Sequence, residues 1–492
     1  MKPTKKPNLI FIMSDQQRFD TISCYGNDWI NTPNLNKLSE ESFVFKNAYV
    51  TQPVCAPARG SIISGLYPHS HGAQVNMIPM DDEVMTIAQM FDSEYKLGYF
   101  GKWHLGADRV KKEGWDEWIS TEEHEYPADE KIEYPLSDYH NWLVKNNFTP
   151  TKENSFGKKI FSEEHRATLP PEFQMASFLA QEAEGFIKKY KDEPFVLFVN
   201  TFEPHSPYSG PYNGMYEPHS IPTCPTFLKE PHNVSDINIH RAKFHTSFLK
   251  GDNNQSTNDY MNSYLAKCGE DFSTEEGWLK LRADYFANIT LVDEMVGKIN
   301  DSISSSNIED NTIVIFTSDH GDMMGDHGMI EKRTFYEESA KVPMLFKIPW
   351  LKNKVIEGDF SHIDLVPTIL KLMNQEPQSN IQGKDISSIF LNGNLVDNEV
   401  VIEWNGIGSV QDRTLGSEKI DLLNANPRRS IIINRMKLNL TLNDSGELFD
   451  LNEDPYEENN LYYLPEYQEI ILEMKNKLIQ WQINNEDYFI FE

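Results

Sequence analysis

The stretch Cys55-Ala56-Pro57-Ala58-Arg59-Gly60-Ser61-Ile62-Ile63-Ser64-Gly65 decides how this chain is interpreted. Pro57 suits the first turn of a helix, and the run to Ser64 followed by Gly65 predicts a short helix with a glycine stop. Cys55 is then expected just before the helix N-terminus, where free N–H groups and the helix dipole favour an anion. A lone cysteine is more often buried and structural, but the complete run favours a functional residue.

The size and composition predict a globular protein with one large and one smaller domain. The chain has 492 residues, of which 39% are hydrophobic and 12% aromatic. No apolar run approaches the ~20 residues of a membrane helix, so we expect no membrane partner. The net charge of −30 argues against nucleic acid as a partner. Four cysteines do not indicate a disulfide framework.

The N-terminus predicts a buried first strand. Three lysines precede the apolar run 9–13, which is too short for the core of a signal peptide. Ser14 and Asp15 follow it, where small residues of a cleavage site would be expected. We therefore expect a cytoplasmic protein.

Short apolar runs alternate with helical patterns along most of the chain. This alternation predicts an α/β fold in which helices cover both faces of the sheet. The predicted strands are 9–13, 195–199, 313–317 and 344–348, and the clearest helical patterns are 173–190 and 278–300.

Two polar segments and a distinct C-terminal part interrupt this pattern. We expect the insertions 109–170 and 203–275 to form walls of a substrate pocket, because long irregular segments in a compact domain are often functional. The predicted division is a catalytic α/β domain at 1–375 and an α+β subdomain at 376–492. The subdomain is expected to hold a small antiparallel sheet with strands at 400–404, 430–434 and 437–442 and a last helix near 465–484.

Candidate metal ligands follow two of the predicted strands. Asp15 and Gln16 come after the first strand, and Asp319 and His320 come after the strand at 313–317. Ligands bind at the carboxyl ends of strands in open α/β sheets, so these distant segments are expected to converge there. Carboxylate, amide and imidazole donors suit Ca²⁺, Mg²⁺ or Mn²⁺.

The spacing Cys-x-Pro-x-Arg with its small-polar-Gly ending resembles the signature of type I sulfatases, and the resemblance covers most of the chain. It implies the alkaline-phosphatase-like fold, a large mixed sheet covered by helices. It also implies that a maturation enzyme oxidises Cys55 to formylglycine, whose hydrated aldehyde attacks sulfur. Arg59 is implied to hold that hydrate. The stretch 447–461 is similar to a closing motif common among sulfatases.

Further motifs match the same family. Gly101-Lys102-Trp103-His104 resembles its Gly-Lys-x-His motif, and Pro204-His205-Ser206-Pro207 resembles its Pro-His-x-Pro motif. The resemblance implies that Lys102 and Lys332 bind the sulfate, that His205 protonates the leaving alcohol and that His104 assists release of sulfate. We expect His69, His71 and His327 to be loop residues near the pocket.

The resemblance also implies one divalent ion beside the nucleophile. Its ligands would be Asp15, Gln16, Asp319 and His320, together with the modified Cys55. Ca²⁺ is the first candidate, with Mn²⁺ and Mg²⁺ as alternatives. Many sulfatases have an Asp where this chain has Gln16, and the pattern here is similar to choline sulfatases and phosphonate monoester hydrolases.

We therefore predict a sulfuric ester hydrolase that acts on a small sulfated sugar. The alternatives are a phosphonate monoester or phosphodiester hydrolase, a choline sulfatase, and a non-catalytic binding protein with an unconverted Cys55. The complete set of predicted ligands argues against the last of these.

Overall fold

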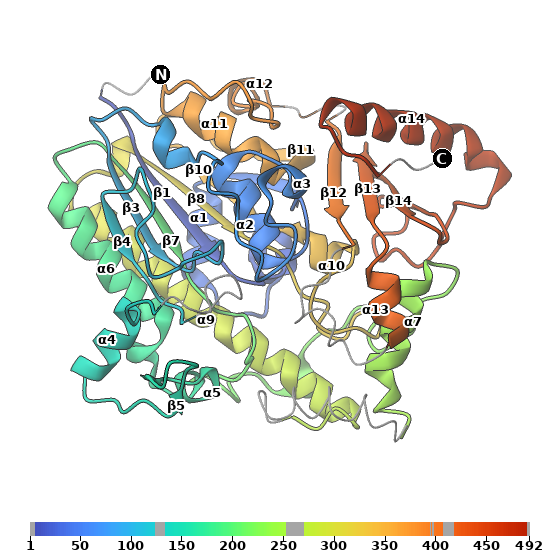
Figure 1. The fold of residues 1–492 in the computed structure, drawn as a ribbon, viewed down its shortest axis with the longest axis horizontal. Helices are drawn as coiled ribbons and strands as arrows, with labels where there is room; N and C mark the ends of the chain where they lie inside the picture. The colour runs from blue at the N-terminus through green and yellow to red at the C-terminus, as the bar shows by residue number, and fades with distance from the viewer. Residues whose placement is uncertain are drawn as a thin grey trace.

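A nine-stranded mixed sheet forms the centre of the protein (Figure 1). The computed structural model describes residues 5–123, 133–251, 270–393, 395, 398–406 and 418–489. The strands lie in the order β11-β2-β10-β8-β1-β7-β3-β4, and β9 pairs with β2. Their bounds are β1 (Asn8–Ser14), β2 (Phe43–Tyr49), β3 (Lys96–Gly101), β4 (Glu117–Ile119), β7 (Phe195–Asn200), β8 (Thr312–Ser318), β9 (Lys341–Val342), β10 (Met344–Lys347) and β11 (Val355–Ser361).

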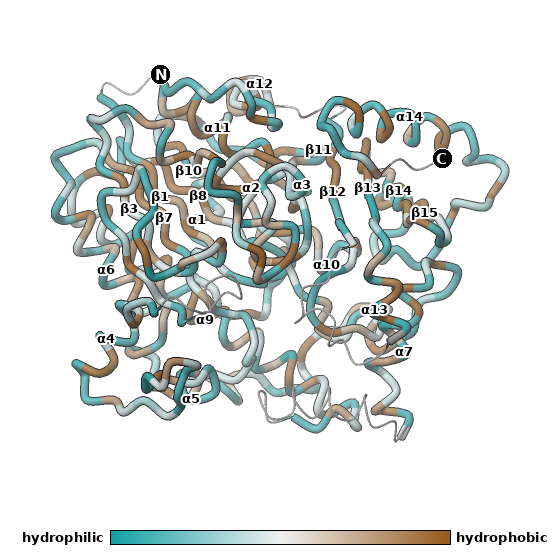
Figure 2. The backbone as a smooth tube through the Cα atoms, viewed as in Figure 1, coloured by the Kyte–Doolittle hydropathy of each residue, from teal (hydrophilic) through white to brown (hydrophobic). Residues whose placement is uncertain are grey.

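The middle of this sheet is parallel. β1 pairs in parallel with both β7 and β8, and β3 pairs in parallel with β7 and β4. β10 runs antiparallel to β8 and β2, which makes the sheet mixed. All four predicted strands are confirmed. Figure 2 shows hydrophobic residues concentrated along β1, β8 and β10, as expected for strands buried on both faces.

Helices cover both faces of the sheet, as predicted. Leu9, Phe11 and Met13 of β1 pack with α2 (Cys55–Ser64) and α11 (Leu365–Leu372). Ile10 and Ile12 point the other way, because successive strand residues alternate between faces. They pack with the second group of helices, α1 (Pro33–Glu40), α6 (Met175–Tyr190) and α9 (Glu275–Ser305).

The C-terminal part holds the predicted small antiparallel sheet. Its order is β12-β13-β14-β15, and α14 packs against it through Ile471, Met474 and Leu478. Tyr67 and Ile363 from the N-terminal part enter the same apolar cluster. The predicted fold class is thus confirmed, while the division at residues 375 and 376 stays a prediction. The bounds are β12 (Val400–Trp404), β13 (Arg428–Ile433), β14 (Met436–Thr441), β15 (Glu447–Asp450), α13 (Glu418–Asn424) and α14 (Gln468–Asn484).

The two polar insertions contain short elements at the edge of the molecule. Residues 124–132 of the first and 252–269 of the second lie outside the described residues. None of the described helices has both the length and the apolar character needed to cross a bilayer. The remaining elements of these insertions are α4 (Asp138–Lys145), β5 (Lys152–Glu153), β6 (Lys159–Ile160), α5 (Glu163–Ala167) and α7 (Asp236–Ser247).

Gly101 ends β3 in a conformation that only glycine adopts easily, with φ +107°. A Cβ there would lie 1.9 Å from the Asn200 carbonyl oxygen, which accepts from the backbone N–H of Lys102. We expect Gly101→Ala to lower the free energy of unfolding by about 3 kcal/mol or more. Gly157, with φ +74° and nothing within 4 Å of its Cβ position, is the control. Gly157→Ala should cost only the left-handed backbone penalty of about 1–2 kcal/mol. Chemical denaturation would measure both, and equal losses would contradict the steric explanation.

Candidate active site

Cys55 is the first residue of α2, not the residue before it as predicted. Val54 supplies the extended cap, with φ −153° and ψ 141°, so the helix begins one residue earlier. Gly65 ends the helix in the left-handed region, as predicted, and donates its N–H to the Ser61 carbonyl. Every residue of α2 is buried, which explains why the stretch has no polar face.

The ends of β1 and β8 bring the candidate metal ligands together. These strands pair in register up to their last residues, so the residues that follow them meet. Each of Asp15, Cys55, Asp319 and His320 offers one ligand atom, and these atoms lie within 4.8 Å of one another. Cys55 Sγ is 3.1 Å from His320 Nε2 and 3.8 Å from Asp15 Oδ1. The predicted convergence of the two strand ends is therefore confirmed.

His320 presents a defined ring nitrogen to this cluster. Its Nδ1 is 2.9 Å from the Gly321 carbonyl oxygen and must donate to it. Nε2 therefore has a free lone pair in the neutral ring and faces Asp15, Asp319 and Cys55. A backbone acceptor on the outer nitrogen is the usual arrangement of a metal-binding histidine.

Arg59 joins the two carboxylates from the next turn of α2. Its Nε donates to Asp319 Oδ2 at 2.8 Å and its Nη2 to Asp15 Oδ2 at 3.0 Å. Its Nη1 donates to the Lys102 carbonyl at 2.9 Å. In this structure Arg59 thus forms ion pairs with the carboxylates that surround Cys55, through the fixed fork of its guanidinium.

Lys102 and His104 lie beside a glutamate that sequence reasoning missed. Lys102 Nζ is 2.7 Å from Asp15 Oδ2 and 3.8 Å from Glu122 Oε1. His104 Nδ1 is 3.5 Å from Glu122 Oε2. Glu122 is buried and belongs to the first insertion, where no motif singled it out.

Lys332 also reaches the cluster around Cys55. Its Nζ is 3.5 Å from Cys55 Sγ, 2.9 Å from His205 Nε2 and 2.6 Å from Gln16 Oε1. His205 Nδ1 is 2.8 Å from the Ser206 carbonyl oxygen and donates to it. The imidazole thus directs Nε2 toward Lys332, whose Nζ also contacts Cys55.

Two further residues that sequence reasoning missed orient Gln16. Its Nε2 donates to the Tyr208 hydroxyl at 3.0 Å and to Asp322 Oδ2. Tyr208 also donates to Asp322, at 2.7 Å. These acceptors fix the amide so that Oε1 points toward Lys332. Asp322 lies three residues after Asp319, so its place just after β8 was the available signal.

The charges around Cys55 favour a thiolate. Burial by itself would raise the pKa of the Cys55 thiol, but Lys332 and Lys102 hold that pKa well below its usual range. Burial also opposes ionisation of Asp15, yet Lys102 and Arg59 help to lower its pKa to about 2. The site is therefore arranged to hold negative charge.

The three histidines that were predicted to be loop residues have structural contacts. His69 and His71 lie on the short helix α3 (Pro68–His71), not in a loop, because Pro68 starts a helical turn. His71 Nε2 is 3.1 Å from the Pro57 carbonyl oxygen, and burial lowers the pKa of His71 to about 4. His327 stacks on Tyr336 with ring centroids 3.8 Å apart.

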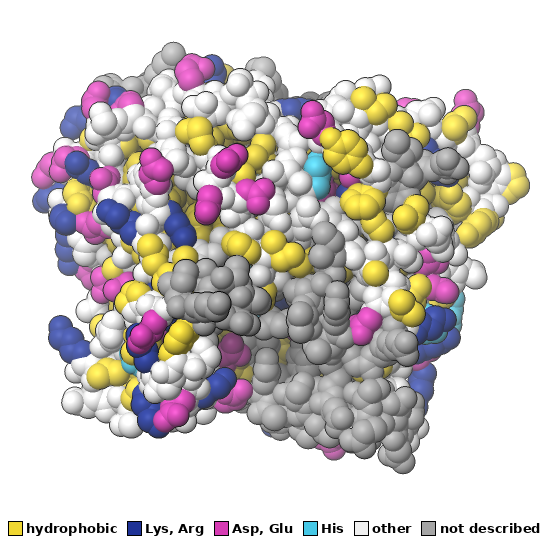
Figure 3. Space-filling view, in the orientation of Figure 1, with side chains coloured by type: hydrophobic (Ala, Val, Ile, Leu, Met, Phe, Trp, Pro, Cys, Tyr) yellow, Lys and Arg dark blue, Asp and Glu magenta, His cyan; other side chains and the backbone are white. Residues whose placement is uncertain are grey.

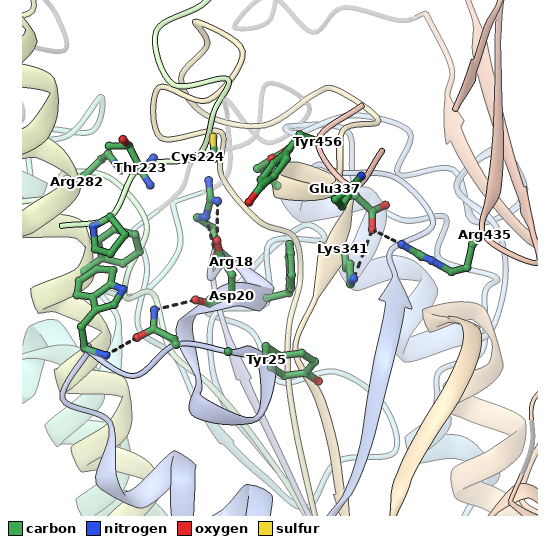
Figure 4. A pocket seen from close by; sticks show the side chains of 18 residues that line it. Arg18, Asp20, Tyr25, Thr223, Cys224, Arg282, Glu337, Lys341, Arg435 and Tyr456 are labelled. Carbon is green, nitrogen blue, oxygen red and sulfur yellow. Dashed lines mark hydrogen bonds and ion pairs between the residues drawn. The ribbon is translucent and has the colours of Figure 1, made fainter. Parts of the chain in front are cut away.

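A pocket of about 420 Å³ lies apart from these residues (Figure 4). It is lined by paired charges, including Arg18 with Asp20 and Glu337 with both Lys341 and Arg435. None of the predicted site residues lines it. Figure 3 shows acidic and basic side chains interspersed over the described residues of the face in view. Neither feature indicates a nucleic-acid surface.

Comparison with known proteins defines the class. Residues 7–375 match the family model described as Sulfatase. The ulvan-active sulfatase of Formosa agariphila is 27% identical over 97% of this chain and 81% of its own length. A solved structure in complex with its substrate D-glucosamine-2-N,6-O-disulfate has a TM-score of 0.75 at 21% identity, covering 99% of both chains. The phosphonate monoester hydrolase of Agrobacterium radiobacter has a TM-score of 0.74 at 21% identity, covering 97% of this chain and 96% of that one.

This chain belongs to the sulfatase family. The predicted fold class and activity class, an alkaline-phosphatase-like α/β fold and a sulfuric ester hydrolase, are confirmed.

The ion pair between His69 and Glu403 predicts that the stability of the protein depends on pH. His69 Nδ1 is 2.5 Å from Glu403 Oε1, so the pair joins α3 to β12 of the small sheet. Burial alone would lower the pKa of His69, but Glu403 raises it above 6.5. The pair's stabilisation is thus complete below pH 6.5 and disappears as pH rises through the higher pKa of the folded state.

We therefore expect His69→Gln to destabilise the protein more at about pH 5.5 than at about pH 8.5. Chemical denaturation at both pH values measures the difference. The exposed His232, changed to Gln, is the control and should leave the pH dependence unaltered. A loss for His69→Gln that does not depend on pH would contradict the ion pair.

Proposed function

We propose that this sulfatase cleaves its ester with a formylglycine made from Cys55 and with one divalent ion beside it. The observation that carries the proposal is the meeting of Cys55, Asp15, Asp319 and His320 at one buried point. A maturation enzyme would have to act on Cys55 before α2 is buried, since the folded thiol is only 1% exposed.

The donor set fits a divalent ion. The carboxylates of Asp15 and Asp319 converge with Nε2 of His320, which the bond at Nδ1 turns toward them, and all three side chains are fully buried. Gln16 Oε1 accepts from Lys332 at 2.6 Å and is the fourth proposed ligand. Oxygen-rich sites of this kind suit Ca²⁺, with Mn²⁺ or Mg²⁺ as alternatives. A bound ion would polarise the sulfate oxygens.

The chain's own residues divide the remaining chemistry. Lys102 and Lys332 place ammonium groups near Cys55 and neutralise charge on the transferring sulfate. His205 Nε2 accepts from the Lys332 ammonium and would pass that proton on to the leaving alcohol, since Nδ1 is engaged by a carbonyl. His104, held beside Glu122, assists regeneration of the aldehyde.

We propose a small sulfated sugar as the substrate. The names of two similar proteins specify sulfated carbohydrates, ulvan and a disulfated glucosamine. Hollows beside His205 and along the first insertion are lined by residues of both predicted pocket walls. A phosphonate monoester remains the second candidate, because the same tetrahedral anion site would accept it and a hydrolase of that class shares the fold.

The nucleophile is tested through Cys55. Protein co-expressed with a converting enzyme should carry an aldehyde at position 55, detected by mass spectrometry after labelling with an aminooxy reagent. Cys55→Ala should lose sulfate-ester turnover by at least about 10³-fold, because no other group in the site can form the covalent ester. Cys24→Ala, at a half-buried free cysteine, is the matched control and should keep full activity.

Full activity with an unmodified thiol would overturn the formylglycine proposal. Parallel assays with p-nitrophenyl sulfate, choline sulfate, sulfated monosaccharides and a phenyl phosphonate ester would separate the candidate substrates. Faster turnover of the phosphonate would make the second candidate function the primary one.

The metal is tested by removing one ligand. Asp319→Asn should weaken Ca²⁺ or Mn²⁺ binding by at least about 10-fold, measured by isothermal titration calorimetry, because it deletes a charge at the ion. The metal-induced rise in unfolding temperature should shrink in parallel. Asp293→Asn changes a buried carboxylate that accepts from Leu35 on α1, and should leave metal affinity unaltered. A chelated enzyme that keeps its full rate would contradict the proposal.

A further inference from the structure

Two neighbouring hollows meet at one short helix of the first insertion. A hollow of about 40 Å³ lies beside His205 and is also lined by Phe202. A larger one, of about 310 Å³, lies over the first insertion and reaches Glu122. Both are lined by Glu163 and Arg166 of α5. Arg166 is thus the cation shared by the two hollows.

The ring of Phe202 ties Arg166 to the catalytic residues. Arg166 Cζ lies 5.9 Å from the ring centroid, and Lys102 Nζ lies 4.9 Å from the same centroid. The His205 ring packs on Phe202 with centroids 4.8 Å apart. Arg166, the lysine that faces Asp15 and the proposed proton donor therefore all lie against one aromatic ring. A group attached to the leaving alcohol beside His205 would lie in the hollow that Arg166 lines.

The acidic residues around Arg166 do not neutralise it. Glu122 lies between Lys102 and His104, and Glu123 pairs with Arg109 at 2.9 Å. Within the part of the chain that the structure describes, no ion pair joins Arg166 to any carboxylate, including Glu163 and Glu164 of its own helix.

The remaining carboxylate in the smaller hollow is also engaged. Glu203 accepts from the Thr201 hydroxyl and from the Ala176 N–H, and burial raises its pKa. Arg166 is therefore a half-buried guanidinium that lines both hollows and, among the described residues, forms no ion pair. Its charge acts on Glu203 and partly offsets the rise of that carboxyl's pKa, but the Glu203 oxygens are already bonded to Thr201 and Ala176.

We propose that Arg166 binds a second anionic group, a sulfate or a carboxylate, on the alcohol half of the ester. This inference rests on the proposed function, because His205 defines the side on which the alcohol leaves. A guanidinium binds either anion through two parallel N–H donors, which gives both affinity and orientation. The substrate class is then a sugar that carries at least two negative charges before cleavage.

The test compares Arg166→Gln with the wild type on four probes. These are p-nitrophenyl sulfate, N-acetylglucosamine 6-sulfate, glucosamine-2-N,6-O-disulfate, and a sulfated uronic acid. Arg166→Gln should lower kcat/KM by about 10- to 100-fold for the probes with a second anion, mainly through KM. It should change the two singly charged probes by less than about threefold. The N-sulfate and the uronate distinguish the two sources of the anion.

Two further variants sharpen the comparison. Arg166→Lys should recover only part of the loss, because an ammonium group lacks the paired donors. Lys152→Gln removes an exposed cation that lines only the larger hollow and should leave all four probes within about threefold. Equal losses on all probes, or no loss on any, would overturn the role of Arg166 while leaving sulfatase activity intact. Failure of the wild type to cleave any sulfate ester would overturn the proposed function and this inference together.

Discussion

The structure depends on the pairing of charges that are buried at the ends of β1 and β8. Asp15 and Asp319 have no exposed surface, and two carboxylates so close together repel each other. Arg59 contacts both of them, and Lys102 adds a second cation at Asp15. Removing any one of these partners would leave an uncompensated buried charge, which typically costs several kcal/mol. The same pairing leaves the remaining lone pairs of the carboxylates directed toward Cys55.

This constraint explains why the central sheet is so apolar. β1 and β8 are completely buried, so the only polar residues that the strands can present lie at their ends. Gln16 and His104 both have positive φ, 68° and 61°, although neither is glycine. Such residues persist only where surrounding contacts hold them, and here the Asp322–Tyr208 pair holds the side chain of Gln16.

The sequence predicted the central strands and the residues that meet at their ends because both follow from local rules. Apolar runs of strand length predict β1, β7, β8 and β10, and the parallel pairing of β1 with β8 then brings Asp15 next to Asp319. The predicted start of α2 was wrong by one residue, because no strong local sequence pattern marks Val54 as the extended residue before the helix. Glu122 could not be predicted, because its role comes from the fold of an irregular insertion. Arg166 was missed for the same reason, since its position beside Phe202 depends on two segments far apart in the chain.

The sequence by itself determined the family and the class of reaction, because a short motif around Cys55 and the residues after two strands encode them locally. Only the tertiary structure decided which carboxylates Arg59 joins, which nitrogen of His320 faces the cluster and which residues lie beside Arg166. Those properties arise from distances between side chains that lie far apart in the chain, and no local pattern specifies such distances.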